Sequence, residues 1–144
     1  MSSNREDWDT VRMNMCIELA KRSTCWKKQT ASIIVKNNII LSEGYNGASS
    51  GKPHCHQVGP RDRLAHRSWS LVNEVHAEEN AISRCDRNRL KGATLYTILS
   101  PCAKCAQLVI DSGITRVVFM SLYSYDSTEY LRAHGVEVIR LSSI

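Results

Sequence analysis

Long apolar runs are absent from this chain of 144 residues, and no stretch approaches the roughly 18 residues that a membrane-spanning helix needs. The start, MSSNREDWDT, is too polar for a signal peptide, so we expect a soluble, unexported protein of the cytoplasm, or of the host cytoplasm for a viral protein. Neither repeats nor low-complexity tracts occur, and an ordinary balance of 42% hydrophobic and 23% charged residues excludes a disordered or fibrous chain. We expect a single domain over residues 1–144, long enough to bury a core without disulfides.

A continuous basic block is also lacking, although 19 Lys and Arg against 14 Asp and Glu give a net charge of +5. Aromatic residues make up only 6% of the chain, which leaves few side chains to stack on nucleic-acid bases. The charge alone is compatible with nucleic acid, with a phosphorylated small molecule, or with an ordinary solvated surface. The absence of a basic stripe with interleaved aromatics makes nucleic acid the least favoured of these partners.

The hydrophobic pattern predicts helices and strands in alternation. Apolar spacing predicts a helix over 5–23, and β-branched runs predict strands 31–36 and 39–45 around an Asn37-Asn38 turn. After a long polar stretch, 46–73, the pattern predicts helices 76–87, 102–112 and 127–134 and strands 94–98, 116–121 and 136–141. Strands that alternate with helices imply parallel pairing and right-handed crossovers. We therefore predict an α/β fold on one mixed sheet that opens with an antiparallel hairpin.

Six cysteines in a chain without an export signal indicate reduced thiols, metal binding or catalysis before disulfides. Cys102 and Cys105 form a C-x-x-C, and two cysteines at this spacing on a helix share one face. Pro101 is well placed to open that helix, because a helix start has no use for the N–H that proline lacks. The positive end of the helix dipole favours the thiolate form that binds metal.

His76-Ala77-Glu78 precedes this pair, and Cys102 stands 26 positions after His76. His76, Cys102 and Cys105 give zinc three protein ligands and leave the fourth position for water, which is the catalytic arrangement. Zinc lowers the pKa of its bound water towards about 7, and Glu78 is expected to take that proton and deliver it to a substrate. The combined pattern H-x-E…P-C-x-x-C is the signature of zinc deaminases. A structural zinc site or a fortuitous C-x-x-C is the alternative.

Three segments together resemble the deoxycytidylate (dCMP) deaminases, with the T-even phage form nearest: His76-Ala-Glu-Glu-Asn-Ala-Ile82, Gly44-Tyr-Asn-Gly47 and Leu99-Ser-Pro-Cys-Ala-Lys-Cys105. The similarity extends from about residue 12 to residue 140. Gly-Tyr-Asn-Gly separates this family from the free cytidine deaminases and the tRNA adenosine deaminases, which share only the zinc signature.

The resemblance implies a cytidine-deaminase-like α/β/α sandwich with a five-stranded mixed sheet, assembled as a homohexamer. It implies hydrolysis of dCMP to dUMP with release of ammonia, which supplies dUMP for thymidylate synthesis. It also implies activation by dCTP with Mg²⁺ and inhibition by dTTP.

The same resemblance implies roles for individual residues. Gly44, Tyr45, Asn46 and Gly47 would form part of the allosteric nucleotide site. Asn46, Ser100 and Tyr123 would bind the substrate, with a backbone carbonyl near Ser100 accepting from the amino group and Tyr123 contacting the phosphate. For Tyr123 alone, the less favoured alternative is a strand-end aromatic that packs on the core.

A second, structural zinc is implied by Cys25, Cys55, His66 and Glu74, which match a ligand set of the phage form. Four protein ligands close such a site, and binding would tie the first helix to the long polar stretch. Carboxylate is the less common structural ligand, so His54 or His56 is an alternative to Glu74. The remaining cysteines, Cys16 and Cys85, are expected to be buried thiols.

The chain departs from the family where Thr30-Ala31-Ser32 replaces the usual Val-Gly-Ala, and we expect Ala31 to narrow the approach to the sugar or phosphate. Two other functions stay open: a polynucleotide deaminase with the same zinc core, and a catalytically silent nucleotide-sensing or zinc-stabilised module. The absence of a basic stripe and the presence of Gly-Tyr-Asn-Gly argue against the first. Glu78 argues against the second, because a silent module has no need of a carboxylate beside the zinc.

Overall fold

A computed structural model describes residues 5–23, 29–48, 74–122 and 127–141, with the backbone alone at 48, 74 and 75. Five strands form one sheet in the order β2-β1-β5-β6-β7. Their bounds are β1 (Ala31–Lys36), β2 (Ile39–Tyr45), β5 (Thr94–Leu99), β6 (Arg116–Ser121) and β7 (Glu137–Arg140). β1 pairs antiparallel with both β2 and β5, whereas β5, β6 and β7 are parallel. The predicted α/β fold on a five-stranded mixed sheet is confirmed.

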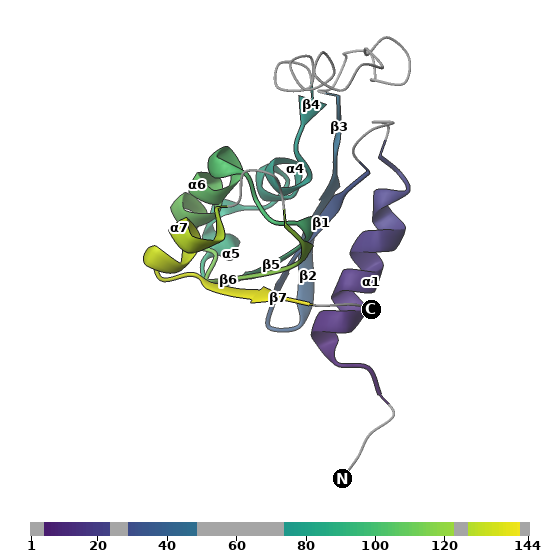
Figure 1. Cartoon of the computed structure of the whole chain (residues 1–144), viewed down its shortest axis with the longest axis horizontal. Coiled ribbons are helices and arrows are strands. Elements are labelled where there is room, and N and C mark those ends of the chain that lie inside the picture. Colours follow the sequence, from purple (N-terminus) through teal and green to yellow (C-terminus); the bar gives the residue numbers. More distant parts are fainter. Residues whose placement is uncertain (1–4, 24–28, 49–73, 123–126, 142–144) are drawn as a thin grey trace.

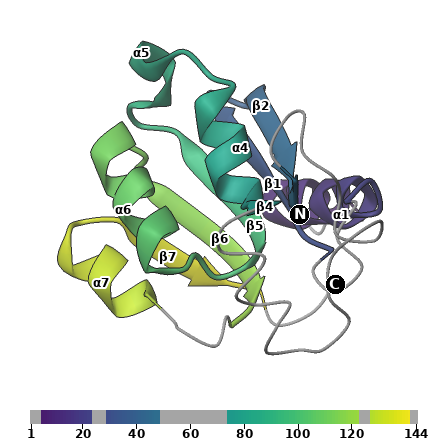
Figure 2. The same ribbon diagram turned by 90° about the horizontal axis from the view of Figure 1, so that it is seen from above.

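Helices cover both faces of the sheet (Figures 1 and 2). Helix α1 (Trp8–Ala20) lies on one face, and α4 (Ala77–Ser83), α6 (Ala103–Ser112) and α7 (Thr128–Ala133) lie on the other. A one-turn helix, α5 (Arg87–Leu90), precedes β5, and a short ladder of β3 (Gly47–Ala48) and β4 (Glu74–Val75) leads away from the sheet. None of the helices in the described ranges has the length and apolar character to cross a membrane.

Alternating side chains of the strands fill two separate apolar layers. Ile34 and Leu95 belong to the layer under α4, α6 and α7, whereas Ile33 and Val118 pack with Met13 of α1. All five side chains are essentially inaccessible to solvent. Because successive residues of a strand point to opposite faces, each residue's position along β1 decides whether it faces α1 or α4.

The β1–β2 hairpin has the predicted bounds and the predicted turn. Asn37 and Asn38 have φ angles of 52° and 62°, the left-handed conformation that a two-residue hairpin requires and that asparagine tolerates. Arg12 of α1 fastens the turn, because its Nη2 donates to Asn38 O at 3.3 Å and to Asn38 Oδ1 at 3.0 Å.

The predicted helix over 76–87 is wrong in its extent. Helix α4 ends at Ser83, and α5 begins separately at Arg87. Asp86 causes the new start, because its side chain accepts a hydrogen bond from Asn88 N at 3.0 Å and so caps α5.

Two other helix starts differ from the prediction. Helix α1 begins at Trp8 rather than near residue 5, since the Asp7 side chain accepts from Thr10 N at 2.8 Å and caps it, and it ends at Ala20 rather than near residue 23. Pro101 does not open α6, because Cys102 occupies the cap position and Pro101 precedes it. The remaining predicted helices and strands are present, with ends that differ by one or two residues.

Helix α1 is joined to the sheet by a partly buried ion pair. Arg116 Nη2 lies 2.6 Å from Asp9 Oδ2, and its Nη1 donates to Asp9 Oδ1 at 3.0 Å. The Tyr96 hydroxyl also donates to Asp9 Oδ1, at 2.7 Å. The hydrogen bonds from Arg116 lower the pKa of the Asp9 carboxyl, and burial followed by the bond to Asp9 raises the pKa of Tyr96 to about 12.

This pair predicts a stability loss for Asp9→Asn. The pKa of Asp9 is lower in the folded protein than its unfolded value of about 3.9, so its stabilisation is full above that pH and is lost as pH falls through the folded pKa. We expect the variant to lose about 2 kcal/mol of unfolding free energy at pH 7, measured by urea denaturation. Between pH 7 and pH 2 the variant should lose less stability than wild type does, because it has no Asp9 carboxylate to protonate. Glu129→Gln is the control, because Glu129 is 85% exposed beside Arg132. Equal urea midpoints for Asp9→Asn and wild type would contradict the prediction.

Candidate metal centre

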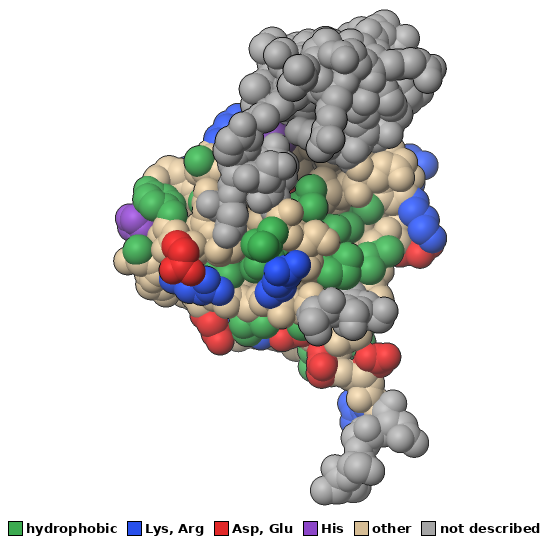
Figure 3. All heavy atoms as spheres, in the orientation of Figure 1, with side chains coloured by type: hydrophobic (Ala, Val, Ile, Leu, Met, Phe, Trp, Pro, Cys, Tyr) green, Lys and Arg blue, Asp and Glu red, His purple; other side chains and the backbone are tan. Residues whose placement is uncertain are grey.

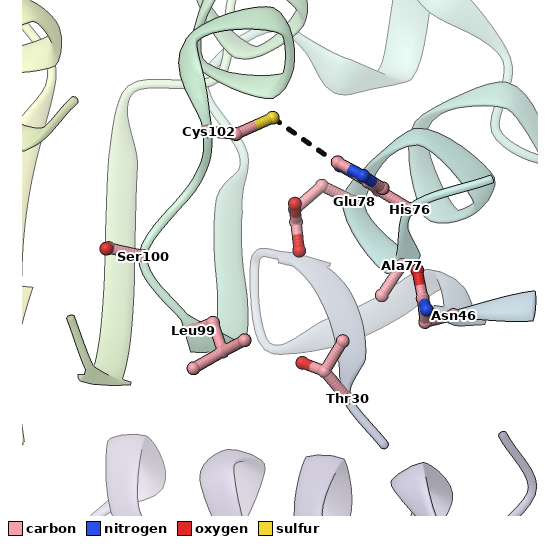
Figure 4. A pocket seen from close by; sticks show the side chains of 8 residues that line it. All are labelled: Thr30, Asn46, His76, Ala77, Glu78, Leu99, Ser100 and Cys102. Atoms are coloured by element: carbon pink, nitrogen blue, oxygen red, sulfur yellow. Dashed lines mark hydrogen bonds between the residues drawn. The ribbon is translucent and has the colours of Figure 1, made fainter. Parts of the chain in front are cut away.

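Two helix N-termini meet at one edge of the sheet, as the sequence predicts. His76 is the cap residue of α4 (φ −69°, ψ 154°) and Cys102 is the cap residue of α6 (φ −72°, ψ 174°). Neither side chain caps its own helix. Cys105 lies in the first turn of α6, three residues after Cys102, and so shares its face. The extended cap conformation directs both cap side chains towards the space between the two helices (Figure 4).

The donor atoms of these three residues have the spacing of a tetrahedral zinc site. His76 Nδ1 lies 3.4 Å from Cys102 Sγ and 3.4 Å from Cys105 Sγ, and all three donors are within 4.8 Å of one another. Zinc bonds of about 2.3 Å to sulfur and about 2.0 Å to nitrogen at tetrahedral angles place the two donor types about 3.5 Å apart. The residues therefore fit the metal that the sequence pattern implies.

The two thiols interact directly. Their mutual hydrogen bond lowers the pKa of Cys102 to about 3 and, together with burial, raises the pKa of Cys105. A coordinated cation deprotonates a thiol outright, and the positive ends of two helices add to this effect. Without a cation the pair therefore favours one thiolate, at Cys102, and a bound cation would convert both cysteines to thiolates beside the imidazole.

Glu78 lies beside the three donors, in the first turn of α4, and is only 5% exposed. Burial raises the pKa of its carboxyl, although the neighbouring His76 lowers it. Its Oε1 accepts a hydrogen bond from Thr97 Oγ1 at 2.9 Å and from Ser32 Oγ at 3.3 Å. A buried carboxyl with a raised pKa is suited to take a proton and to return it.

A small pocket opens beside this group (Figure 4). Its lining residues come from the residue before β1, the residue after β2, the end of β5 and the two helix starts: Thr30, Asn46, His76, Ala77, Glu78, Leu99, Ser100 and Cys102. Two residues predicted to bind substrate, Asn46 and Ser100, are among them, and both are buried. Glu78 lies between the metal ligands and Thr30, so Thr30 marks the end of the pocket remote from the metal (Figure 4).

Thr30 is a residue of this pocket that the sequence analysis missed. Its side chain is buried, and its Oγ1 has no hydrogen-bond partner in the described structure. Such an unpaired hydroxyl costs about 1–3 kcal/mol. A polar residue just before the apolar strand β1 is the signal that was available in the sequence.

The expectation that Ala31 narrows the approach to the sugar or phosphate is wrong for this pocket. Ala31 is fully buried in the apolar layer with Met13 and Cys16 of α1, on the opposite face of the sheet. The period-2 alternation of β1 instead directs its two neighbours, Thr30 and Ser32, to the side of the metal centre.

The segment predicted to bind an effector nucleotide contacts α4. A Cβ atom on Gly44 would lie 2.6 Å from Ala81 N and 2.7 Å from Ala77 O, so only glycine permits this approach. Asn46 N donates to Thr30 O at 3.1 Å. The effector role of Gly44, Tyr45, Asn46 and Gly47 stays a prediction.

Several predicted residues cannot be placed. Cys25, Cys55, His66 and Tyr123 lie outside the described residues, and Glu74 is described by its backbone alone, in β4. The second zinc site therefore stays a prediction.

The other two cysteines differ from each other. Cys16 is fully buried, its thiol donates to Tyr96 O at 3.6 Å, and burial raises its pKa to about 12. Cys85 is only partly buried. The prediction of a buried thiol is confirmed for Cys16 and is too strong for Cys85.

Three converging donors beside a buried carboxyl and a pocket fit a metal-dependent enzyme of the zinc type. Residues 6–121 match the protein-family model of the cytidine and deoxycytidylate deaminase zinc-binding region. The chain belongs to the cytidine and deoxycytidylate deaminase family.

Named relatives and solved structures agree with this family. The chain is 32% identical to the deoxycytidylate deaminase of Enterobacteria phage T2, over 88% of each chain. It is 37% identical to that of Mycobacterium phage D29, over 81% of this chain and 96% of the relative. The crystal structure of cyanophage S-TIM5 dCMP deaminase in complex with dCMP and dUMP superposes with a TM-score of 0.78 at 24% identity, over 96% of this chain and all of that one, which supports the fold.

The contact at Gly44 predicts that Gly44→Ala displaces α4 and with it His76 and Glu78. We expect the purified variant to retain less zinc than wild type, measured by atomic absorption after dialysis, and to melt at a lower temperature. Gly135→Ala is the control, since Gly135 has φ 83° and no atom within 4 Å of an added Cβ. That variant should lose about 1–2 kcal/mol from backbone strain and keep its zinc. Full zinc content in Gly44→Ala would contradict the prediction.

Proposed function

We propose that this protein hydrolyses dCMP to dUMP and ammonia, with zinc held by His76, Cys102 and Cys105. The observation that supports this most directly is the buried Glu78 carboxyl beside three donors of zinc geometry, at one end of a pocket. The phage and human relatives that bear the name deoxycytidylate deaminase support dCMP as the substrate.

Zinc, when bound, lowers the pKa of water and makes it a nucleophile at neutral pH. Glu78 accepts the proton that this water loses as its oxygen adds to C4 of the cytosine ring. Glu78 then delivers this proton to N3, takes the remaining proton from the hydroxyl group added at C4 and passes it to the amino group. The C4–N4 bond breaks, ammonia leaves and the C4 oxygen becomes the carbonyl of uracil. Its burial supports this alternation, because the neutral and charged carboxyl are brought closer in free energy.

The rest of the pocket would orient the nucleotide. With C4 at the metal end, the backbone carbonyl near Ser100 accepts from the amino group, and Asn46 contributes a polar side chain. The unpaired Thr30 hydroxyl, at the remote end, would bond the part of the nucleotide farthest from C4. Tyr123 is proposed as the contact to the phosphate.

The charge distribution on the face shown in Figure 3 favours a mononucleotide over a polynucleotide. On the face that Figure 3 presents, Lys and Arg side chains are interspersed with Asp and Glu. Polynucleotide binding requires a continuous positive track with stacking aromatics.

Regulation and assembly are proposed from the family resemblance. Activation by dCTP with Mg²⁺ and inhibition by dTTP would act through Gly44, Tyr45, Asn46 and Gly47, in a homohexamer. The segment lies against α4, which supports communication with Glu78, because Asn80 Nδ2 of α4 donates to Tyr45 O at 2.9 Å.

The test of the proposed chemistry compares Glu78→Gln with Glu79→Gln. Glutamine keeps the size of the side chain but cannot take a proton, so Glu78→Gln should bind zinc normally and lose at least about 100-fold in kcat on dCMP, measured by the loss of cytosine absorbance. Glu79 is the matched neighbour, paired with Lys104 at 3.2 Å on the surface side of α4, and its variant should turn over like wild type. A nearly active, zinc-loaded Glu78→Gln enzyme would refute the role of Glu78.

A second assay tests regulation with wild-type enzyme and subsaturating dCMP. Addition of dCTP with Mg²⁺ should raise the rate, and dTTP should lower it. Turnover that is indifferent to both nucleotides would leave the chemistry in place and remove the effector role of residues 44–47. No turnover of dCMP under any condition would refute the proposed substrate and shift attention to polynucleotides or to a silent module.

A further inference from the structure

Two hydroxyl side chains lie directly behind the carboxyl of Glu78. Ser32 of β1 and Thr97 of β5 are cross-strand partners in the antiparallel register, and neither side chain is accessible to solvent. They occupy the face of the sheet that α4 covers. Their neighbours two residues along on that face, Ile34 and Leu95, are apolar and belong to the core.

The three polar groups form a closed set of hydrogen bonds. Thr97 Oγ1 donates to Glu78 Oε1 at 2.9 Å, Ser32 Oγ lies 2.9 Å from Thr97 Oγ1, and Ser32 Oγ lies 3.3 Å from Glu78 Oε1. A buried hydroxyl without a partner destabilises a fold, so two of them in an apolar layer need an acceptor. Each hydroxyl has one proton to donate. Thr97 donates directly to Glu78 Oε1, and Ser32 donates to Thr97 Oγ1 at the shorter distance or to Glu78 Oε1 at the longer one.

We propose that Ser32 and Thr97 are positioning residues, which hold Oε1 of Glu78 against the sheet and leave Oε2 as the oxygen that transfers the proton. The proposal rests on the proposed deaminase function and concerns how its proton carrier is oriented. Neither residue touches the substrate or the metal in this role.

The geometry gives the two hydroxyls a specific task. Glu78 must take a proton and release it again within one turnover, and each rotation of its side chain would misplace the carboxyl. A hydroxyl can donate to Oε1 whether or not Oε2 bears a proton, so this hydrogen bond is kept in both the charged and the protonated state of the carboxyl. Since the hydroxyls come from two paired strands, the sheet itself fixes their position.

The test compares Thr97→Val, which keeps the shape of the side chain, with Thr97→Ser, which keeps the hydroxyl. Loss of a hydrogen bond to a charged group predicts that Thr97→Val lowers kcat on dCMP by about 10- to 100-fold with little change in KM. Thr97→Ser should retain most of kcat. Ser32→Ala should lose less than Thr97→Val, because its bond to Glu78 is the longer one. A packing role alone predicts the reverse order, with Thr97→Ser the more damaged.

Ser112→Ala is the matched control, since Ser112 is another buried serine, at the end of α6, whose Oγ donates to Val109 O at 2.8 Å and not to Glu78. It should lose stability and keep kcat. Zinc content and melting temperature, measured on every variant, separate a misplaced carboxyl from a lost metal or a lost fold.

A crystal structure of zinc-loaded Thr97→Val gives a readout that needs no turnover. We expect Glu78 to adopt a different rotamer or two alternate ones, whereas wild type keeps one. An unchanged Glu78 rotamer, or a Thr97→Val kcat equal to that of Ser112→Ala, would overturn the proposal. Failure of wild type itself to deaminate dCMP would instead refute the proposed substrate, and the rotamer comparison would still decide the positioning role.

Discussion

The close approach of α4 to the sheet is the contact on which the metal centre depends. Gly44 allows the backbones to meet, Ser42 Oγ donates to Ala81 O at 2.6 Å, and Asn80 Nδ2 donates to Tyr45 O at 2.9 Å. These contacts fix the depth and the rotation of a helix only seven residues long, which could not hold its position by propensity alone. Because His76 and Glu78 lie at the start of this helix, their distances to the other site residues follow from how the helix is seated.

The direction of the strands determines where the pocket residues beside β1 and β5, and the Cys102 ligand, are placed. The antiparallel pairing of β1 with β5 places the start of one strand beside the end of the other. Thr30, just before β1, and Ser100, just after β5, therefore line the same pocket, and Ser100 N donates to Ser121 O at 2.8 Å to extend the sheet at this edge. Cys102 follows two residues later as the start of α6. Backbone pairing thus brings together donors that are far apart in the sequence.

The metal ligands could be predicted from the sequence because each depends on a local rule. Cys102 and Cys105 share a helical face by their spacing, and the His76-x-Glu78 pattern needs only one helix start. The roles of Thr30, Ser32 and Thr97 could not be predicted, because they depend on which strand lies beside which, and in what register, across 65 residues between Ser32 and Thr97. The division of the predicted helix 76–87 depends on a different feature. Helix α4 ends at Ser83, and the cap formed by Asp86 starts a separate helix at Arg87. The ligands of the second zinc lie largely outside the described residues.

Charge balance links the metal to the stability of the fold. With a metal bound, Glu78 and two thiolates would bring three negative charges into a largely buried space, and burial already raises the pKa of Glu78. Two helix N-termini and the sheet hydroxyls offset part of this cost, and a divalent cation offsets the remainder, so metal binding contributes to folding. For that contribution to be large the donors must be close before the ion arrives. Ala81 of α4 and Ala106 of α6 are both fully buried in one apolar layer, and their small side chains let the two helices approach each other closely. This packing meets the condition, because it holds His76 Nδ1 and Cys102 Sγ 3.4 Å apart.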